Sequence, residues 1–429
     1  MFGFANFLLL ALFAAAVFDL IFALARGGGL RGALHGLWNT PHLLFGQQLA
    51  EWRLQLGRIL FAAGLAAYEI SVVFCNSMAR QNWAWVQGVM SPVLEWLAFL
   101  CFGAKILFGT RYTWRELLAG GALYFIARWV YFNSQNIWWI GIVVAVLAAK
   151  DVRLRHPLQV YFASGCAAMA VVLALHFAGI VAPDLTSERM GALRGTYGYG
   201  HPNTFGGLVF GLVLAYALLR AQKVRWVDCL LVFAVGVFLL VGPASRSAAL
   251  CTLALAVGLV FCRLRAGRSV PRWWPGTCAG MVGLTAAVSY LLPLLVIKVG
   301  PWNNDIGPAW LAKLDSLLTC RISLTWMAYR LLDVKIAGQV FNWPTVDNSF
   351  AFALFQFGPV VAALLGILFA AALLGHAKQG RRVEVCCLFA MLAYAYMEVQ
   401  PFHLTTNPTA LLLCGAVFAQ TSARWQKIE

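Results

Sequence analysis

Long apolar runs alternate with short polar segments along almost the entire chain. Many of these runs contain about 20 residues, which is the length that a helix needs to cross the hydrocarbon core of a bilayer. The pattern predicts an all-α polytopic membrane protein with about 12 or 13 transmembrane helices. The predicted spans are residues 2–25, 59–78, 86–108, 116–133, 137–150, 157–181, 204–220, 227–242, 247–263, 276–299, 349–375, 384–399 and 409–421.

Two regions leave this count open. The span 137–150 is short, so it is expected to pack against neighbouring helices or to pair with 157–181 as one broken element. Residues 26–58 contain three consecutive glycines and the amphipathic run Gln47 to Arg58. They are predicted to form either an interfacial helix or a partial crossing.

The longest polar segment is 300–346, and it includes a stretch from Ala309 to Leu332 with an apolar face at helical spacing. We expect this segment to form a partly helical cap over a cavity on the outer side of the membrane, as lids do in other enzymes. The chain shows no internal repeat and no linker, so residues 1–429 are predicted to form a single membrane domain.

Composition agrees with this pattern. The chain of 429 residues is 62% hydrophobic and 11% charged, whereas soluble domains contain about 25% charged residues. No sizeable soluble domain is therefore expected. The N-terminus lacks a basic segment and a small-residue cleavage site, so residues 2–25 are predicted to be a retained helix rather than a signal peptide.

A net charge of +16 would also suit a nucleic-acid-binding protein. Most of the 32 Lys and Arg residues, however, fall in alternate loops, such as the cluster from Arg263 to Arg272. This distribution is the positive-inside bias of membrane proteins. It argues against nucleic acid, predicts contact with anionic membrane lipid, and places the C-terminus inside.

Ten of the 11 cysteines fall within or beside apolar segments, where a free thiol behaves as a small hydrophobic group. Cys320 lies alone in the predicted outer loop. The sequence therefore predicts neither an outer disulfide nor a metal site built from thiolates.

The loops on the opposite side to the basic clusters carry unusual polar residues. This grouping on one side predicts an active site at the outer membrane surface. The segments concerned are Arg194 to Asn203, Ser245 to Ser247, Asp315 to Arg321, Asp347 to Ser349 and Glu398 to Asn407.

The segment from Arg194 to Asn203 precedes a predicted helix. Arg194 offers a planar fork that suits phosphate oxygens. Tyr197, Tyr199, His201 and Asn203 can bond to or stack on a sugar. The structural alternative is an ordered turn in which Asn203 caps the helix.

Arg246 lies in a very short outer turn, where a guanidinium needs either a partner, a wet cavity or lipid headgroups. Arg321 and Arg330 lie nine residues apart on the outer-loop helix and so face different directions. An arginine cluster of this kind suits a pyrophosphate.

Acidic and imidazole side chains lie in the same loops. Asp347 is a candidate general base, with His201 and Glu398 as rivals. Asn348 and His403 are candidate sugar ligands. The structural alternatives are a helix cap at Asp347 and an ion pair at Glu398. Within the spans, Glu69 and Arg128 are expected to pair with each other for structural reasons.

The outer loops contain no closely spaced carboxylate pair such as D-x-D. The sequence therefore predicts no bound metal and no cofactor. In such a site the charge that develops on a leaving group would be neutralised by arginine instead of Mg²⁺.

Taken together, these motifs resemble the polysaccharide repeat-unit polymerase and O-antigen ligase superfamily of bacterial membranes. The resemblance rests on YGYGHPNTFGG, the SRS turn, LDSLLTCRISL, VDNSFAFALFQFG and the pattern from Glu398 to Asn407. It covers about residues 190–410, and the first half of the chain is similar only in hydropathy.

This resemblance implies an inverting, metal-independent glycosyl transfer at the outer face of the bacterial plasma (inner) membrane. The donor would be a glycan on polyprenyl pyrophosphate, and the acceptor would be a sugar hydroxyl of another lipid-linked unit. Outer-face arginines would bind the pyrophosphate, and in this chain the resemblance implies that role for Arg194 and Arg246, with Arg321 as a third candidate. A flippase and a chain-length regulator are the implied protein partners.

Two other functions remain open at this point. Ligases of the superfamily tend to have a histidine where this chain has Asp347 and Asn348, which favours a polymerase over a ligase. A dozen helices also suit a transporter of lipid-linked sugars, although transporters often show related halves and polar sites at the midplane.

Overall fold

The computed structural model describes residues 2–25, 29–45, 50–181, 187–189, 192–296 and 308–418, and it is mostly helical. Within these residues, eight helices are long and apolar enough to cross a membrane. The all-α polytopic prediction is thus confirmed, but only eight of the predicted crossings meet both requirements. They are Asn6–Ala25, Glu51–Cys75, Val86–Phe108, Arg155–Phe177, Pro202–Leu219, Arg246–Leu264, Trp274–Leu295 and Pro359–Lys378.

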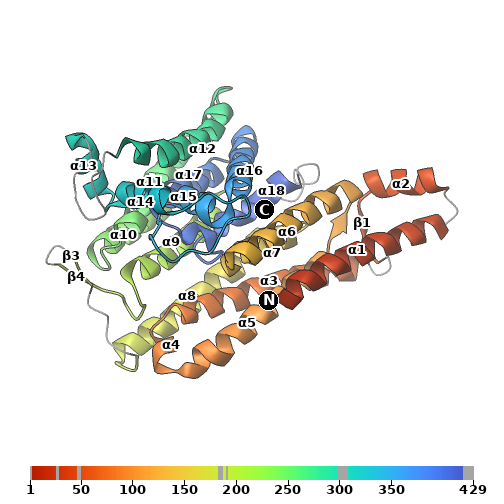
Figure 1. Cartoon of the computed structure of the whole chain (residues 1–429), viewed down its shortest axis with the longest axis horizontal. Helices are drawn as coiled ribbons and strands as arrows, with labels where there is room; N and C mark the ends of the chain where they lie inside the picture. The colour runs from red at the N-terminus through yellow and green to blue at the C-terminus, as the bar shows by residue number, and fades with distance from the viewer. Residues whose placement is uncertain are drawn as a thin grey trace.

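The first half of the chain forms one group of long helices, coloured red to yellow in Figure 1. Within it, α3 packs along both α5 and α8. The helices are α1 (Phe2–Ala25), α2 (Leu30–Asn39), α3 (Ala50–Cys75), α4 (Ala79–Asn82), the π-helical turn η1 (Val86–Met90), α5 (Ser91–Phe108), α6 (Trp114–Ser134), α7 (Ile137–Ala148) and α8 (Arg155–Phe177).

The second half forms the adjacent group, coloured green to blue. Here α10 packs on α11, α11 on α17, and α12 on α16. The elements are α9 (Pro202–Leu219), α10 (Trp226–Val241), α11 (Arg246–Leu264), α12 (Trp274–Leu291), η2 (Leu292–Leu295), α13 (Ala309–Leu317), α14 (Arg321–Leu331), α15 (Ser349–Phe352), η3 (Ala353–Phe357), α16 (Pro359–Lys378), α17 (Arg382–Met397), η4 (Gln400–Phe402), η5 (Pro408–Leu413) and α18 (Cys414–Val417).

Two short antiparallel ladders connect loops. In the first, β1 (His42–Leu43) pairs with β2 (Arg111–Tyr112). In the second, β3 (Ser187–Arg189) pairs with β4 (Ala192–Arg194), which ends at the predicted phosphate ligand.

The predicted amphipathic run from Gln47 to Arg58 does not form a separate helix. From Ala50 onward it belongs to α3, which continues without a break to Cys75. Residues 46–49 and 26–28 lie outside the described residues, and α2 occupies Leu30–Asn39. The apolar run therefore predicted the crossing correctly, but the predicted start at residue 59 lies nine residues after the observed start of α3 at Ala50.

The short helix α7 lies in the interior of the bundle, as its length required. All residues from Trp139 to Ala148 are buried, and the side chain of Asn136 caps the helix by accepting from the backbone N–H of Trp139 at 3.2 Å. Burial on every side explains why twelve almost wholly apolar residues form a stable element here.

Many large apolar side chains are exposed along the outer surfaces of the long helices. Phe13 on α1 is 70% exposed, Val241 on α10 is 76% exposed and Val257 on α11 is 69% exposed. Exposed apolar surface of this extent is unfavourable in water and suits the hydrocarbon of a bilayer.

The predicted pair between Glu69 and Arg128 is wrong. Arg128 instead donates to the side-chain oxygen of Asn6 at 2.8 Å and lies over the ring of Phe132. Glu69 is buried in α3, where the backbone of Gly165 approaches its carboxylate. Periodicity places residues on a helix face, but it does not specify which helices become neighbours.

The helical stretch predicted from Ala309 to Leu332 is present, but it is two helices rather than one. The break falls at Thr319 and Cys320, whose φ angles are +59° and +65°. These left-handed residues turn the chain between α13 and α14. Residues 300–307 of the predicted outer loop lie outside the described residues.

Cys320 provides a test of the predicted topology. All 11 cysteines lie in described parts of the chain, and only Cys320 is exposed. We expect a membrane-impermeant maleimide to label the protein in intact cells, and we expect Cys320→Ser to abolish that labelling. Labelling that appears only after the membrane is permeabilised would place α13 and α14 on the cytoplasmic side.

Candidate functional site

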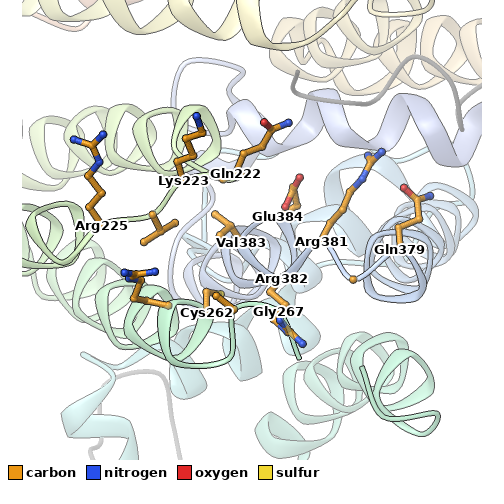
Figure 2. A pocket seen from close by; sticks show the side chains of 15 residues that line it. Gln222, Lys223, Arg225, Cys262, Gly267, Gln379, Arg381, Arg382, Val383 and Glu384 are labelled. Atoms are coloured by element: carbon orange, nitrogen blue, oxygen red, sulfur yellow. The ribbon is translucent and has the colours of Figure 1, made fainter. Parts of the chain in front are cut away.

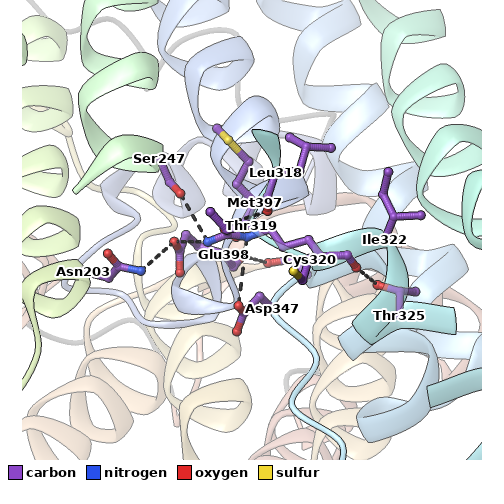
Figure 3. A network of polar contacts seen from close by, with 12 residues as sticks. Asn203, Ser247, Leu318, Thr319, Cys320, Ile322, Thr325, Asp347, Met397 and Glu398 are labelled. Carbon is purple, nitrogen blue, oxygen red and sulfur yellow. Dashed lines mark hydrogen bonds and ion pairs between the residues drawn. The ribbon is translucent and has the colours of Figure 1, made fainter. Parts of the chain in front are cut away.

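Figure 3 shows a polar cluster that includes Ser247, Thr319 and Glu398. The buried guanidinium of Arg321, at the start of α14, is bonded to all three. It donates to the backbone oxygens of Met397 and Leu318 and to the side chains of Thr319, Ser247 and Glu398. An arginine side chain has five N–H donors. Only 9% of the Arg321 side chain is exposed, so water cannot satisfy its N–H groups. All five donors instead have acceptors within the protein.

The position of Arg321 is fixed by Asp315, which is completely buried. One carboxylate oxygen of Asp315 accepts from the backbone N–H groups of Ile322 and Ser323 at 2.8 and 3.2 Å. The other accepts from the hydroxyl of Ser323 at 2.8 Å. The carboxylate thus accepts hydrogen bonds from backbone N–H groups in the first turn of α14, and its negative charge interacts favourably with the helix dipole.

Glu398, directly after α17, is the main partner of Arg321. Its Oε1 lies 2.6 Å from Nη2 of Arg321 and also accepts from the side-chain amide of Asn203 at 3.1 Å. The hydroxyl of Ser349 donates to its backbone oxygen at 2.5 Å. Glu398 therefore links α9, α14 and α15 at the end of α17.

Burial raises the pKa of Glu398 to about 7, although the nearby Arg321 guanidinium lowers it. The negative charge of Asp347 adds to the increase in the pKa. A carboxyl with a pKa near neutrality can both accept and release a proton under physiological conditions. Titratable groups with strongly shifted pKa values often lie at functional sites, so the Glu398 carboxyl is a candidate functional group.

Arg194 joins the cluster through Asn203. Its Nη2 donates to the side-chain oxygen of Asn203 at 2.9 Å and to the backbone oxygen of Ala244 at 3.3 Å. Ala244 belongs to the turn that carries Arg246 and Ser247. Arg194 is buried, with 7% exposed, whereas Arg246 is exposed at the first position of α11.

Two consecutive glycines allow α9 to approach this cluster closely. A Cβ at Gly206 would lie 2.2 Å from the hydroxyl of Ser245, and one at Gly207 would lie 1.8 Å from the side-chain oxygen of Gln400. That oxygen accepts from the hydroxyl of Tyr394 at 2.8 Å. The FGG sequence therefore serves close helix packing beside the site.

Asp347 lies at the edge of the cluster. Its Oδ2 is 4.0 Å from Nε of Arg321, and 32% of its side chain is exposed. The neighbouring Asn348 is buried and caps α15, because its side-chain oxygen accepts from Phe350 and Ala351 at 2.9 and 3.1 Å. The predicted cap thus belongs to Asn348, which leaves Asp347 facing the more open side.

The remaining predicted residues lie around this cluster in packing roles. Tyr197 stacks on Phe205 with ring centroids 5.0 Å apart, and Tyr199 is fully buried next to the same ring. The ring nitrogen of His201 accepts from the backbone of Asn203 at 3.1 Å and so caps α9.

His403 packs against Trp138 at a centroid distance of 3.7 Å. Burial lowers its pKa to about 3. An imidazole with so low a pKa stays neutral at physiological pH and is a weak base. His403 therefore contributes packing rather than proton transfer in this arrangement.

Several residues of the cluster lie in segments singled out from the sequence but were given no individual role there. Asp315 was part of a recognised motif, but its capping role depends on the chain reversal at Cys320. Gln400, whose amide donates to the backbone oxygen of Asn203 at 3.2 Å, lies in the segment from Glu398 to Asn407, but its spacing predicted no role for its side chain. The hydroxyl of Ser349 lay in a motif, and its partner becomes clear only from the fold.

Removal of the Arg321 guanidinium should destabilise the protein strongly. Arg321→Gln leaves the buried carboxylate of Glu398 without its cation, and breaking a buried ion pair in this way costs about 3–5 kcal/mol. Arg330→Gln is the matched control, since Arg330 lies on the same helix but is exposed, and its change should stay within about 0.5 kcal/mol. Thermal unfolding in detergent measures both. Equal effects would contradict the central role of Arg321.

The raised pKa of Glu398 also predicts a pH dependence of stability. Between the ordinary value of 4.5 and about 7, the folded protein holds a proton that the unfolded chain has released. The free energy of unfolding should therefore fall as pH rises through this window, by about 3 kcal/mol at most. Glu398→Gln should remove that component in melting curves from pH 5 to 8. A pH dependence identical to that of the wild type would contradict the assignment.

No protein family, curated protein or solved structure matches the chain. The function of the chain is therefore inferred from its own residues: the five motifs, the buried cluster that they form, and the apolar helices around it.

Proposed function

We propose that the chain is a membrane glycosyltransferase that polymerises oligosaccharide repeat units carried on polyprenyl pyrophosphate. The proposal places the reaction at the outer face of the bacterial plasma membrane. The product would be a capsular, exo- or O-antigen polysaccharide.

One observation carries this proposal: all five motifs of the resemblance contribute to the same hydrogen-bonded cluster. Asn203, Ser247, Arg321, Ser349 and Glu398 come from five separate segments, and each is bonded to Arg321 or Glu398. Motifs that only completed membrane-spanning helices would not be expected to bring their polar side chains together. Polar groups close to hydrocarbon are costly and usually functional.

The arginines then divide into two roles. Arg321 already gives all five donors to protein acceptors, so in this arrangement it supports the site rather than binding phosphate. Arg194 and Arg246 are the better candidates for the pyrophosphate, since the backbone of Ala244 holds Arg194 beside the turn that carries Arg246. Guanidinium groups match phosphate oxygens in pairs.

Asp347 is the proposed general base, because it is the carboxylate of the cluster with the larger exposed fraction. It would accept the proton of the acceptor hydroxyl while that oxygen forms a bond to the anomeric carbon. The bond from that carbon to the pyrophosphate oxygen would break, and its electron pair would leave with the phosphate. Attack from the opposite side inverts the configuration.

The surroundings of the cluster suit a lipid-linked substrate. Ser349, which bonds to the backbone of Glu398, also lines an apolar cavity between α7, α12, α16 and α17. The other lining residues include Tyr290, Phe350, Met391 and Phe402. This cavity of about 100 Å³ would hold only a short part of an isoprenoid chain, with the pyrophosphate directed toward the polar residues.

Substitution of the proposed site should abolish transfer without loss of the folded protein. Asp347→Asn and the pair Arg194→Gln with Arg246→Gln should each lower the rate by at least about 100-fold, in line with the loss of a general base or of phosphate stabilisation. Arg330→Gln should retain activity. The assay is incubation of purified protein with synthetic lipid-linked repeat units, read as a ladder of products.

The same assay separates the alternatives. If Glu398 is the base instead, Asp347→Asn stays active and the wild-type rate rises with pH through about 7. A ligase would transfer a preformed polymer to a different lipid and give no ladder. Movement of substrate across proteoliposomes without any new glycosidic bond would reject the enzymatic proposal.

A further inference from the structure

A second polar site lies at the opposite end of the bundle. The helix α17 begins at Arg382 and ends at Met397, directly before Glu398. Its 16 residues extend about 24 Å at 1.5 Å per residue. The groups at the start of α17 are therefore separated from the Arg321 cluster by most of the thickness of a bilayer.

At this end three loops surround a cavity of about 1000 Å³ (Figure 2). They connect α9 to α10, α11 to α12, and α16 to α17. Five cationic side chains line the cavity, and Glu384 is the acidic one among its described lining residues. The cations are Lys223, Arg225, Arg263, Arg381 and Arg382.

The rim of this cavity is held in place by hydrogen bonds. Arg382 donates to the backbone oxygens of Arg265, at 2.6 Å, and of Arg268. Arg220 bonds to Asp228 at 3.1 Å and to the backbone oxygen of Lys223 at 3.3 Å. These bonds fix the loop between α9 and α10 and join the start of α17 to the loop between α11 and α12. The backbone that carries the cations is therefore ordered before any ligand arrives.

The surface beside the cavity is apolar. Trp226, directly after Arg225, is 53% exposed, and Leu264, directly after Arg263, is 61% exposed. Trp273, in the next loop, is 64% exposed. Exposed tryptophans next to basic side chains are typical of the boundary between hydrocarbon and headgroups.

We propose that this cavity binds the phosphate-bearing headgroup of an anionic membrane phospholipid. Lys223, Arg225, Arg263 and Arg381 bind the phosphate oxygens, and Arg382 holds the rim through its bonds to backbone oxygens. The acyl chains lie against the exposed apolar surface of α10 and α11. This site is independent of the proposed glycosyl transfer. It differs from ordinary surface charge because three loops enclose it and hydrogen bonds fix its rim.

The test uses purified protein in detergent, titrated with phosphatidylglycerol and with phosphatidylcholine, with bound lipid counted by native mass spectrometry. Arg225→Gln combined with Arg263→Gln should weaken phosphatidylglycerol binding by about tenfold or more, since each cation near the lipid surface contributes on the order of a fivefold factor. Arg268→Gln combined with Arg272→Gln removes the same charge outside the lining residues. That control should weaken binding clearly less than the lining pair does, because Arg268 and Arg272 supply only the general attraction of basic loops to anionic lipid.

Three results would overturn the proposal. Equal losses in the two double variants would mean that the charge acts diffusely and not through the cavity. Equal binding of phosphatidylcholine would remove the role of the anionic headgroup. Displacement of phosphatidylglycerol by glycerol phosphate at similar concentrations would identify a soluble phosphate ligand instead of a lipid.

Discussion

The buried guanidinium of Arg321 imposes the strictest constraint on this structure. A charge close to hydrocarbon is tolerated only if every hydrogen bond and its counterion are present. Arg321 meets this condition with acceptors from α11, from the end of α17 and from its own loop. Those segments must therefore end at the same level of the bundle. The cluster then fixes Asn203 and, through it, Arg194.

Much of the fold could be predicted because apolar length is a local property. Most predicted spans coincide with one helix, even where, as in α6 and α17, the helix is too polar or too short to qualify as a crossing alone. The span 349–375 is instead divided among α15, η3 and α16, and the described part of 409–421 forms η5 and α18. The errors concern which helices lie next to one another. The pairing of Arg128 with Asn6 depends on how α1 lies against α6, and no periodicity within one segment contains that information.

The motifs that form the cluster could be located from the sequence, but the contacts of their side chains could not. Arg321 was expected to bind phosphate, yet its donors are taken up inside the protein, because α14 turns it toward Glu398. That orientation follows from two left-handed residues, Thr319 and Cys320, and from the cap at Asp315. Such conformations depend on tertiary contacts, since β-branched and other non-glycine residues rarely favour them locally.

The polar groups at the two ends of the bundle are connected by the same helices, α11 and α17. α11 carries Arg246 at its start and Arg263 near its end, and α17 extends from Arg382 to the residue before Glu398. A slip of either helix by one turn, about 5.4 Å, would draw a polar group from one end into the hydrocarbon. Fixed anchors at both ends therefore set the depth of α11 and α17. The proposed reaction between lipid-linked substrates would need this constraint, because its cluster would have to stay level with the headgroups.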